Sequence, residues 1–235
     1  GPYEAGPVNP ILTQRDLPPG RPDRVEATGH ADLVRLADGS WWGVFLATRP
    51  FAGQSTLLGR ETFLLPVSWR DGWPLFLAAG EPVPLVVKRP ALPASPGEQW
   101  NQWADDFNER ALSAEWIRLR NPGPVQDHAL EGGNLVLIPG ADPAGSLGAP
   151  AFWGRRLRHP AATVTTTVSF APGKPGDFAG LLAFMDEAHF LAFGIEGRQL
   201  VARRRTDAKQ DERGEFVASA PRTGTGPLWP CHSLS

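Results

Sequence analysis

The chain has 235 residues, including 26 glycines and 25 prolines, and a formal net charge of −2. Glycine and proline together make up about a fifth of the chain, against roughly 12% in average proteins, and both residues break helices. This composition excludes a long helical bundle or coiled coil and favours short strands joined by turns. The near-neutral charge argues against a nucleic-acid partner, and no apolar run reaches the roughly 18 residues of a membrane-spanning helix.

The first 90 residues are expected to form an antiparallel meander. We expect strands over 27–36, 41–48, 57–69 and 73–78, with tight turns at Asp38-Gly39 and Asp71-Gly72 because glycine accepts a positive φ. The strand at 41–48 is apolar almost throughout, so we expect both of its faces to be buried. Successive hairpins of this kind are typical of a propeller blade or a barrel.

A second β-rich unit is expected after a proline-rich linker. The predicted boundaries are a first domain over 1–90, a linker over 91–103 and a second domain over 104–235. Strands are expected over 112–119, 134–139, 163–170, 178–184, 190–195 and 199–203, with a single helical turn at 113–116 as the best helix signal. Valine and threonine alternate strictly in 163–170, which predicts a half-buried strand. Short, evenly spaced strands favour a β-sandwich.

Several chemistries lack their usual residues. The single cysteine, Cys231, excludes an intramolecular disulfide framework. There is no G-x-S-x-G elbow and no phosphate-binding loop, and the five histidines form no H-x-H or i,i+4 pair. The basic run Arg203-Arg204-Arg205 is interpreted as a solvated strand end rather than a phosphate site.

Two segments stand out as candidate sites. His30, flanked by small residues in a strand, either points into a pocket or is a structural histidine bonded to a backbone carbonyl. Arg60 and Glu61 are opposite charges within an apolar strand, where adjacent residues face opposite sides and a buried charge needs a partner. Arg60 therefore either donates to a ligand or carboxylate, or belongs to a structural ion pair. The tryptophans at 41, 42, 69 and 73 either stack on sugars or, as we favour, form core.

The chain resembles glycoside hydrolase family 43, in its β-xylosidase and α-L-arabinofuranosidase branch. In the first unit the resemblance rests on GPYEAGPVNPILTQRD, ATGHADLV, DGSWWGVFLATRP and LLGRETFLLPVSWRDGWP, in this order. In the second unit it rests on DDFNERALSAEWIRLRNP, APAFWGRRLRHPAATVTTTVSF and FAGLLAFMDEAHFLAFGI. It extends from Gly1 to about Trp229.

The resemblance implies an all-β fold: the last blade of a partial five-bladed β-propeller, followed by a concanavalin A-like β-sandwich. It implies a fragment of an inverting glycosidase that cleaves β-1,4-xylosyl or α-L-arabinofuranosyl linkages of hemicellulose, with one carboxylic acid and one carboxylate base. The residues after Trp229 do not resemble the family, so we expect a frameshift or a premature stop there and a sandwich cut before it closes.

The resemblance also assigns site residues. The family acid, base and modulating carboxylate are expected upstream of Gly1, so this chain carries no catalytic carboxylate and is expected to be inactive alone. Asp32 and Glu61 match none of the three. His30 matches the family histidine of T-G-H, which lies near the propeller axis and is expected to help bind substrate. In some members this histidine helps to hold a hydrated calcium or sodium ion through water, or contacts the carboxylates of the site. Arg60 matches the arginine of L-G-R-E, which contacts xylose or arabinose hydroxyls.

For partners, the resemblance implies a xylo-oligosaccharide or arabinoxylan substrate, and charge and hydropathy predict neither a nucleic-acid nor a membrane partner. No cofactor is required, although the resemblance allows a structural calcium ion and a homo-oligomeric parent. A cytoplasmic location is favoured over secretion, but the missing N-terminus leaves it open. The alternatives are a carbohydrate-binding or structural sandwich, for which Trp153 and Phe152 are the candidate platform or else core, and a non-functional gene remnant.

Overall fold

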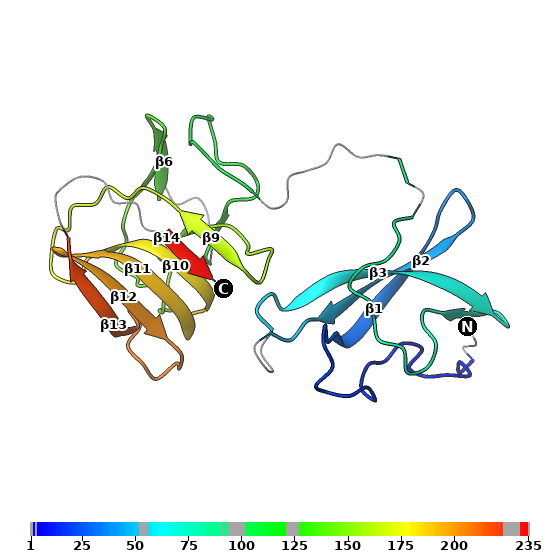
Figure 1. The fold of residues 1–235 in the computed structure, drawn as a ribbon. Coiled ribbons are helices and arrows are strands. Elements are labelled where there is room, and N and C mark those ends of the chain that lie inside the picture. The colour runs from blue at the N-terminus through cyan, green and yellow to red at the C-terminus, as the bar shows by residue number, and fades with distance from the viewer. Residues whose placement is uncertain are drawn as a thin grey trace. The chain divides into compact units, whose positions relative to one another are not determined.

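The protein is built from strands and turns (Figure 1). The computed structural model describes residues 2, 4–51, 56–90, 92–93, 102–120, 127–222 and 231–234. These residues contain no helix, so none of them lies in a helix that could cross a membrane. The chain divides into two compact units: Gly1–Glu98 with Arg158–Pro160, and Gln99–Leu157 with Ala161–Ser235. The expected linker at 91–103 lies mostly outside the described residues.

The first unit is a four-stranded antiparallel meander. Its strands are β1 (Glu26–Arg35), β2 (Trp41–Thr48), β3 (Arg60–Arg70) and β4 (Trp73–Leu75), paired in the order β1-β2-β3-β4. The two aspartate-glycine turns lie where the sequence predicts them, and Gly39 and Gly72 have φ values of 84° and 82°. A positive φ strains most other residues, so these glycines fix both hairpins. The meander expected over the first 90 residues is confirmed.

One face of the meander carries the core of this unit. Phe45, Ala47 and Leu65 are at most 1% exposed and pack with Phe76 and Val83. The expectation that both faces of β2 are buried is wrong for the opposite face, where Val44 and Leu46 are only half-buried. Alternate strand residues point to opposite sides, and the core cluster covers only the side that Phe45 and Ala47 occupy.

Gly43 of β2 gives a stability prediction. A β-carbon at this position would lie 2.1 Å from Cε1 of Phe76, which is itself buried. Gly43→Ala should therefore lower the free energy of unfolding of this unit by about 1–3 kcal/mol, because the ring must move within a packed core. Hydrogen exchange of the β2 and β3 amides measures this free energy unit by unit.

Gly29→Ala is the matched control on the neighbouring strand. An added β-carbon there meets no atom within 4 Å, so this variant should leave the exchange rates of β2 and β3 close to those of the wild type. Equal protection in both variants would contradict the packing argument.

The second unit is built around a four-stranded antiparallel sheet. Its strands are β10 (Phe178–Asp186), β11 (His189–Glu196), β12 (Gln199–Arg205) and β13 (Glu215–Pro221). Three two-stranded sheets accompany it: β5 (Ile117–Arg118) with β8 (Trp153–Gly154), β6 (His128–Glu131) with β7 (Asn134–Leu137), and β9 (Ala162–Thr165) with β14 (Cys231–Leu234). Phe190, Ile195 and Val201 are buried at 5%, 1% and 3% exposure.

Two expected strands of this unit are shorter than predicted. The alternating segment 163–170 is paired only over Ala162–Thr165, apart from one isolated bridge, and Val164 is 43% exposed. The strand that pairs with it, β14, is only four residues long, so the alternation of valine and threonine continues beyond the residues that have a partner strand. The strand expected over 112–119 shrinks to Ile117–Arg118, because residues 113–116 form a turn closed by the Trp116 amide donating to the Ser113 carbonyl at 3.0 Å.

The arginine run at the end of β12 is not a solvated strand end, and that prediction is wrong. Arg205 is 5% exposed, and Arg203 makes a two-nitrogen ion pair with Glu196 at 2.8–3.0 Å. Only Arg204 is exposed. Because alternate residues of a strand share a face, Arg203 and Arg205 both point away from the side on which Arg204 meets solvent.

Candidate functional site

His30 lies at an irregular point of β1. The pairing of β1 with β2 shifts register between Glu26 and Gly29 and again between Gly29 and Asp32. Ala27 and His30 have φ values of 51° and 53°, which non-glycine residues rarely adopt. Bulges of this kind turn a side chain away from the direction that regular pleating would give it. The imidazole is exposed on the surface of the meander.

Arg60 reaches His30 from the far side of β2. It is the first residue of β3, and its register partner is Thr48 at the end of β2. Its Nη2 is 2.9 Å from Nδ1 of His30, although the residues are 30 positions apart. Neighbouring strands lie about 4.8 Å apart, so a side chain as long as arginine is needed to span β2. The structure thus brings the two sequence-predicted binding residues together.

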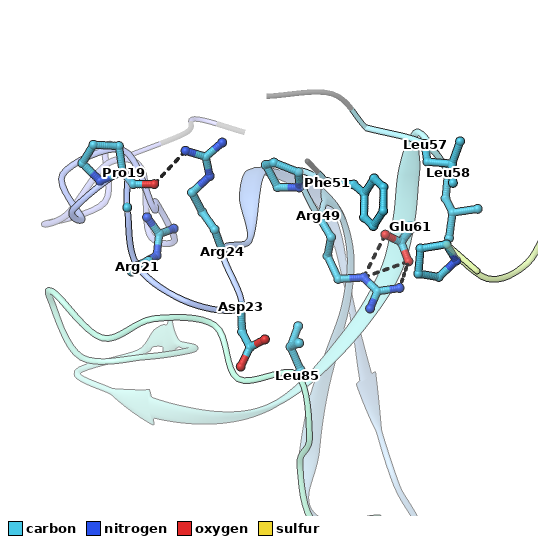
Figure 2. Close-up of a pocket in the computed structure, with 13 residues that line it drawn as sticks. Pro19, Arg21, Asp23, Arg24, Arg49, Phe51, Leu57, Leu58, Glu61 and Leu85 are labelled. Carbon is cyan, nitrogen blue, oxygen red and sulfur yellow. Dashed lines mark hydrogen bonds and ion pairs between the residues drawn. The ribbon is translucent and has the colours of Figure 1, made fainter. Parts of the chain in front are cut away.

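Glu61 belongs to a separate ion pair. Its carboxylate accepts hydrogen bonds from Arg49, whose Nε lies 3.0 Å from Oε1 and 3.1 Å from Oε2 (Figure 2). Both side chains are partly buried, at 37% exposure for Arg49 and 21% for Glu61. The hydrogen bonds that Arg49 donates to the Glu61 carboxylate raise the pKa of Arg49 above its ordinary value. The structural ion pair that the sequence left open is therefore made by Glu61, and its partner is Arg49 rather than Arg60.

A cavity of about 330 Å³ lies beside this ion pair, between the loop before β1 and the β2–β3 connection (Figure 2). The polar part of its lining comes from Arg21, Arg24, Arg49, Asp23 and Glu61. The arginines are engaged by the protein itself: Arg21 donates to two backbone carbonyls, and Arg24 donates to the Pro19 carbonyl at 2.8 Å. Neither His30 nor Arg60 lines this cavity, so the predicted pair and the cavity are separate features.

Sequence reasoning nominated His30 and Arg60 but missed Arg49. The ion pair follows from the register of the hairpin: Glu61 lies opposite Ala47, and Arg49 is two residues further along the chain, so it is the diagonal neighbour of Glu61 on the same face. Asp32 is exposed on β1, where it pairs with Val44. Among the described residues no group of three or more histidine, cysteine, aspartate or glutamate side chains is placed to hold a metal ion.

The aromatic residues proposed as a sugar platform in the second unit are engaged by neighbours. Trp153 lies 4.4 Å from the His128 ring, centroid to centroid, and 5.7 Å below the guanidinium of Arg118. Phe152 packs near Phe184, with ring centroids 5.9 Å apart. Both are half-buried. These contacts favour a packing role over an exposed platform.

Comparison with known families decides what these units are. Residues 104–224, just over half of the chain, match the family model described as the β-xylosidase C-terminal concanavalin A-like domain. Residues 1–74 match the model of glycosyl hydrolases family 43. The chain belongs to glycoside hydrolase family 43. The expected fold is confirmed: in this family 43 chain the meander is the last blade of a partial five-bladed β-propeller, followed by a concanavalin A-like β-sandwich.

Relatives with described activities support the same branch of family 43. The chain is 36% identical over 230 residues to the non-reducing end α-L-arabinofuranosidase BoGH43B of Bacteroides ovatus, covering 95% of this chain and 42% of the relative. It is 30% identical over 206 residues to a xylosidase/arabinosidase of Butyrivibrio fibrisolvens, covering 80% of this chain and 36% of the relative.

Among solved structures, the GH43 protein BlXynB of Bacillus licheniformis matches with a TM-score of 0.85 and 31% identity. That match covers 98% of this chain and 44% of BlXynB. The family 43 chain therefore spans about two fifths of the length of the relatives that it matches.

Proposed function

We propose that this chain supplies the substrate-facing last blade and the sandwich of a glycoside hydrolase that acts on hemicellulose. Its substrates would be β-1,4-xylosyl or α-L-arabinofuranosyl linkages in xylo-oligosaccharides or arabinoxylan. The observation that carries the proposal is the 2.9 Å contact between Arg60 and His30. It joins, on one surface, the two residues that match the family's sugar-contacting positions. The names of the relatives support the same substrate class.

The role proposed for the pair is binding and orientation, not proton transfer. A guanidinium carries five donors in a fixed fork, which suits the adjacent hydroxyl oxygens of a pentose ring. The family reaction needs one carboxylic acid to protonate the leaving oxygen and one carboxylate to activate water. Glu61 is committed to Arg49, so we assign it neither task. Those carboxylates are expected in the part of the relatives that this chain does not span.

The test compares the chain alone with a chimera. In the chimera, this chain replaces the matching two fifths of the Bacteroides ovatus relative. The chain alone should hydrolyse neither p-nitrophenyl xyloside nor p-nitrophenyl arabinofuranoside above a heat-killed control, because acid and base catalysis each contribute roughly 10²–10⁴-fold. The chimera should hydrolyse at least one of them.

Turnover by the chain alone would contradict the assignment of the catalytic carboxylates. A folded chimera without activity on either substrate would contradict the proposed function itself. The ratio of the two activities would separate xylosidase from arabinofuranosidase specificity.

A further inference from the structure

We infer that Arg60 holds His30 as the neutral tautomer protonated at Nε2, so that the pair presents only hydrogen-bond donors and binds oxygen acceptors rather than a metal ion. Its link to a sugar substrate rests on the proposed function. The tautomer itself follows from the contact between the two side chains.

The first step is the direction of the hydrogen bond. The guanidinium of arginine stays protonated in proteins and has no acceptor atom, so Nη2 of Arg60 is the donor. Nδ1 of His30, 2.9 Å away, must then offer its lone pair. A neutral imidazole carries a single proton. With Nδ1 as acceptor, that proton lies on Nε2.

The second step is what the ring can still bind. Its one lone pair is taken by Arg60, so His30 has no nitrogen left to ligate a metal ion. A bridging water would not restore the site, because water bound to a cation directs its hydrogens outward and needs an acceptor, whereas Nε2–H is a donor. The positive charge of Arg60 also opposes a cation on the ring. The residues therefore do not fit the water-mediated metal role that the family resemblance suggested for His30.

The third step is that the backbone fixes the ring in this arrangement. His30 has a φ of 53° and lies in a stretch of β1 with two register shifts. Strained backbone of this kind persists when the surrounding structure over-determines it. The bulged strand turns the imidazole toward Arg60 across β2. Arg60 and His30 thus form a donor-only pair that selects ligands with oxygen acceptors, such as sugar hydroxyls or carboxylates.

The tautomer can be measured on the full chain without any substrate. Long-range ¹H–¹⁵N correlation spectra distinguish a protonated ring nitrogen from one that carries a lone pair. They would be recorded at about pH 8, where free imidazole is neutral. His30→Gln assigns the His30 signals among those of the five histidines. We expect a protonated Nε2 and a lone-pair Nδ1 in the wild type, and loss of this single-tautomer pattern in Arg60→Met.

Arg35→Met is the matched control, because Arg35 is an exposed arginine at the C-terminal end of β1, opposite Trp41. It should leave the His30 pattern unchanged. Titration with calcium chloride should not shift the His30 signals. Protonated Nδ1 in the wild type, or a saturable calcium shift that His30→Gln abolishes, would overturn the inference. No sugar is involved, so this result is independent of the hydrolysis assays.

Discussion

Replacing Arg205 by methionine is expected to destabilise the sandwich unit by about 3 kcal/mol or more. The side chain is 5% exposed, and its two terminal nitrogens donate to four backbone carbonyl oxygens at 2.6–3.0 Å, those of Gly145, Glu187, Ala208 and Gln210. A hydrogen bond to a charged group contributes about 1.5–3 kcal/mol, and a buried acceptor without a partner costs about 1–3 kcal/mol. Methionine would leave these carbonyls without their donor.

Part of this loss is offset because removing a buried charge also removes its desolvation cost. Nε of Arg205 is buried without a hydrogen-bond partner among the described residues, so the wild type does carry such a cost. The four hydrogen bonds contribute more free energy than the one unpaired nitrogen costs. The net effect of Arg205→Met should therefore still be strongly destabilising. The bonds also join three loops, so their loss should loosen residues 145, 187 and 208–210 together.

Arg204→Met is the control next to it, because Arg204 is exposed on the same strand. It should change stability by less than about 0.5 kcal/mol. Hydrogen exchange of the amides of β10, β11 and β12 reports the unfolding of this unit separately from the meander. If both variants showed the same protection as the wild type, the hydrogen bonds from Arg205 to the four backbone carbonyls would not stabilise this unit.

Much of the fold could be predicted because its signals are local. Aspartate-glycine pairs define the two hairpins of the meander, and the strands β10, β11 and β12 lie close to their expected ranges. The errors arose where a residue's partner is distant in the sequence. Arg205 looked like a surface charge, since nothing near it in sequence indicates that its carbonyl partners include Gly145, 60 residues earlier.

In the candidate site, too, local signals could be predicted and contacts between distant residues could not. Composition and periodicity left His30 and Arg60 open between structural and binding roles, and only family resemblance nominated both. Their contact spans an intervening strand, and the register shifts of β1 leave no mark that a single sequence reveals. Arg49 was missed because its ion pair with Glu61 depends on the exact register of β2 with β3.

Within the chimera, Arg60→Met is expected to lower kcat/KM by about 100-fold. In the proposed function Arg60 donates charged hydrogen bonds to the sugar, and such bonds contribute about 1.5–3 kcal/mol each. Each loss of about 1.4 kcal/mol of transition-state stabilisation lowers the rate about tenfold. The kcat/KM of Arg60→Lys should lie between those of Arg60→Met and the unsubstituted chimera, because lysine keeps the charge but not the planar fork of hydrogen-bond donors. Initial rates on the p-nitrophenyl substrate that the parent chimera hydrolyses measure both variants.

A fall in kcat/KM caused by lost stability of the blade can be distinguished from one caused by lost contact with the sugar. Arg60 is exposed, so Arg60→Met should leave the hydrogen-exchange protection of β2 and β3 intact while the rate falls. Arg35→Met removes another exposed arginine, at the C-terminal end of β1, and should retain full kcat/KM. Unchanged kcat/KM in Arg60→Met would contradict a sugar-contacting role for Arg60. A fall that came with lost protection would instead assign Arg60 to the framework of the blade.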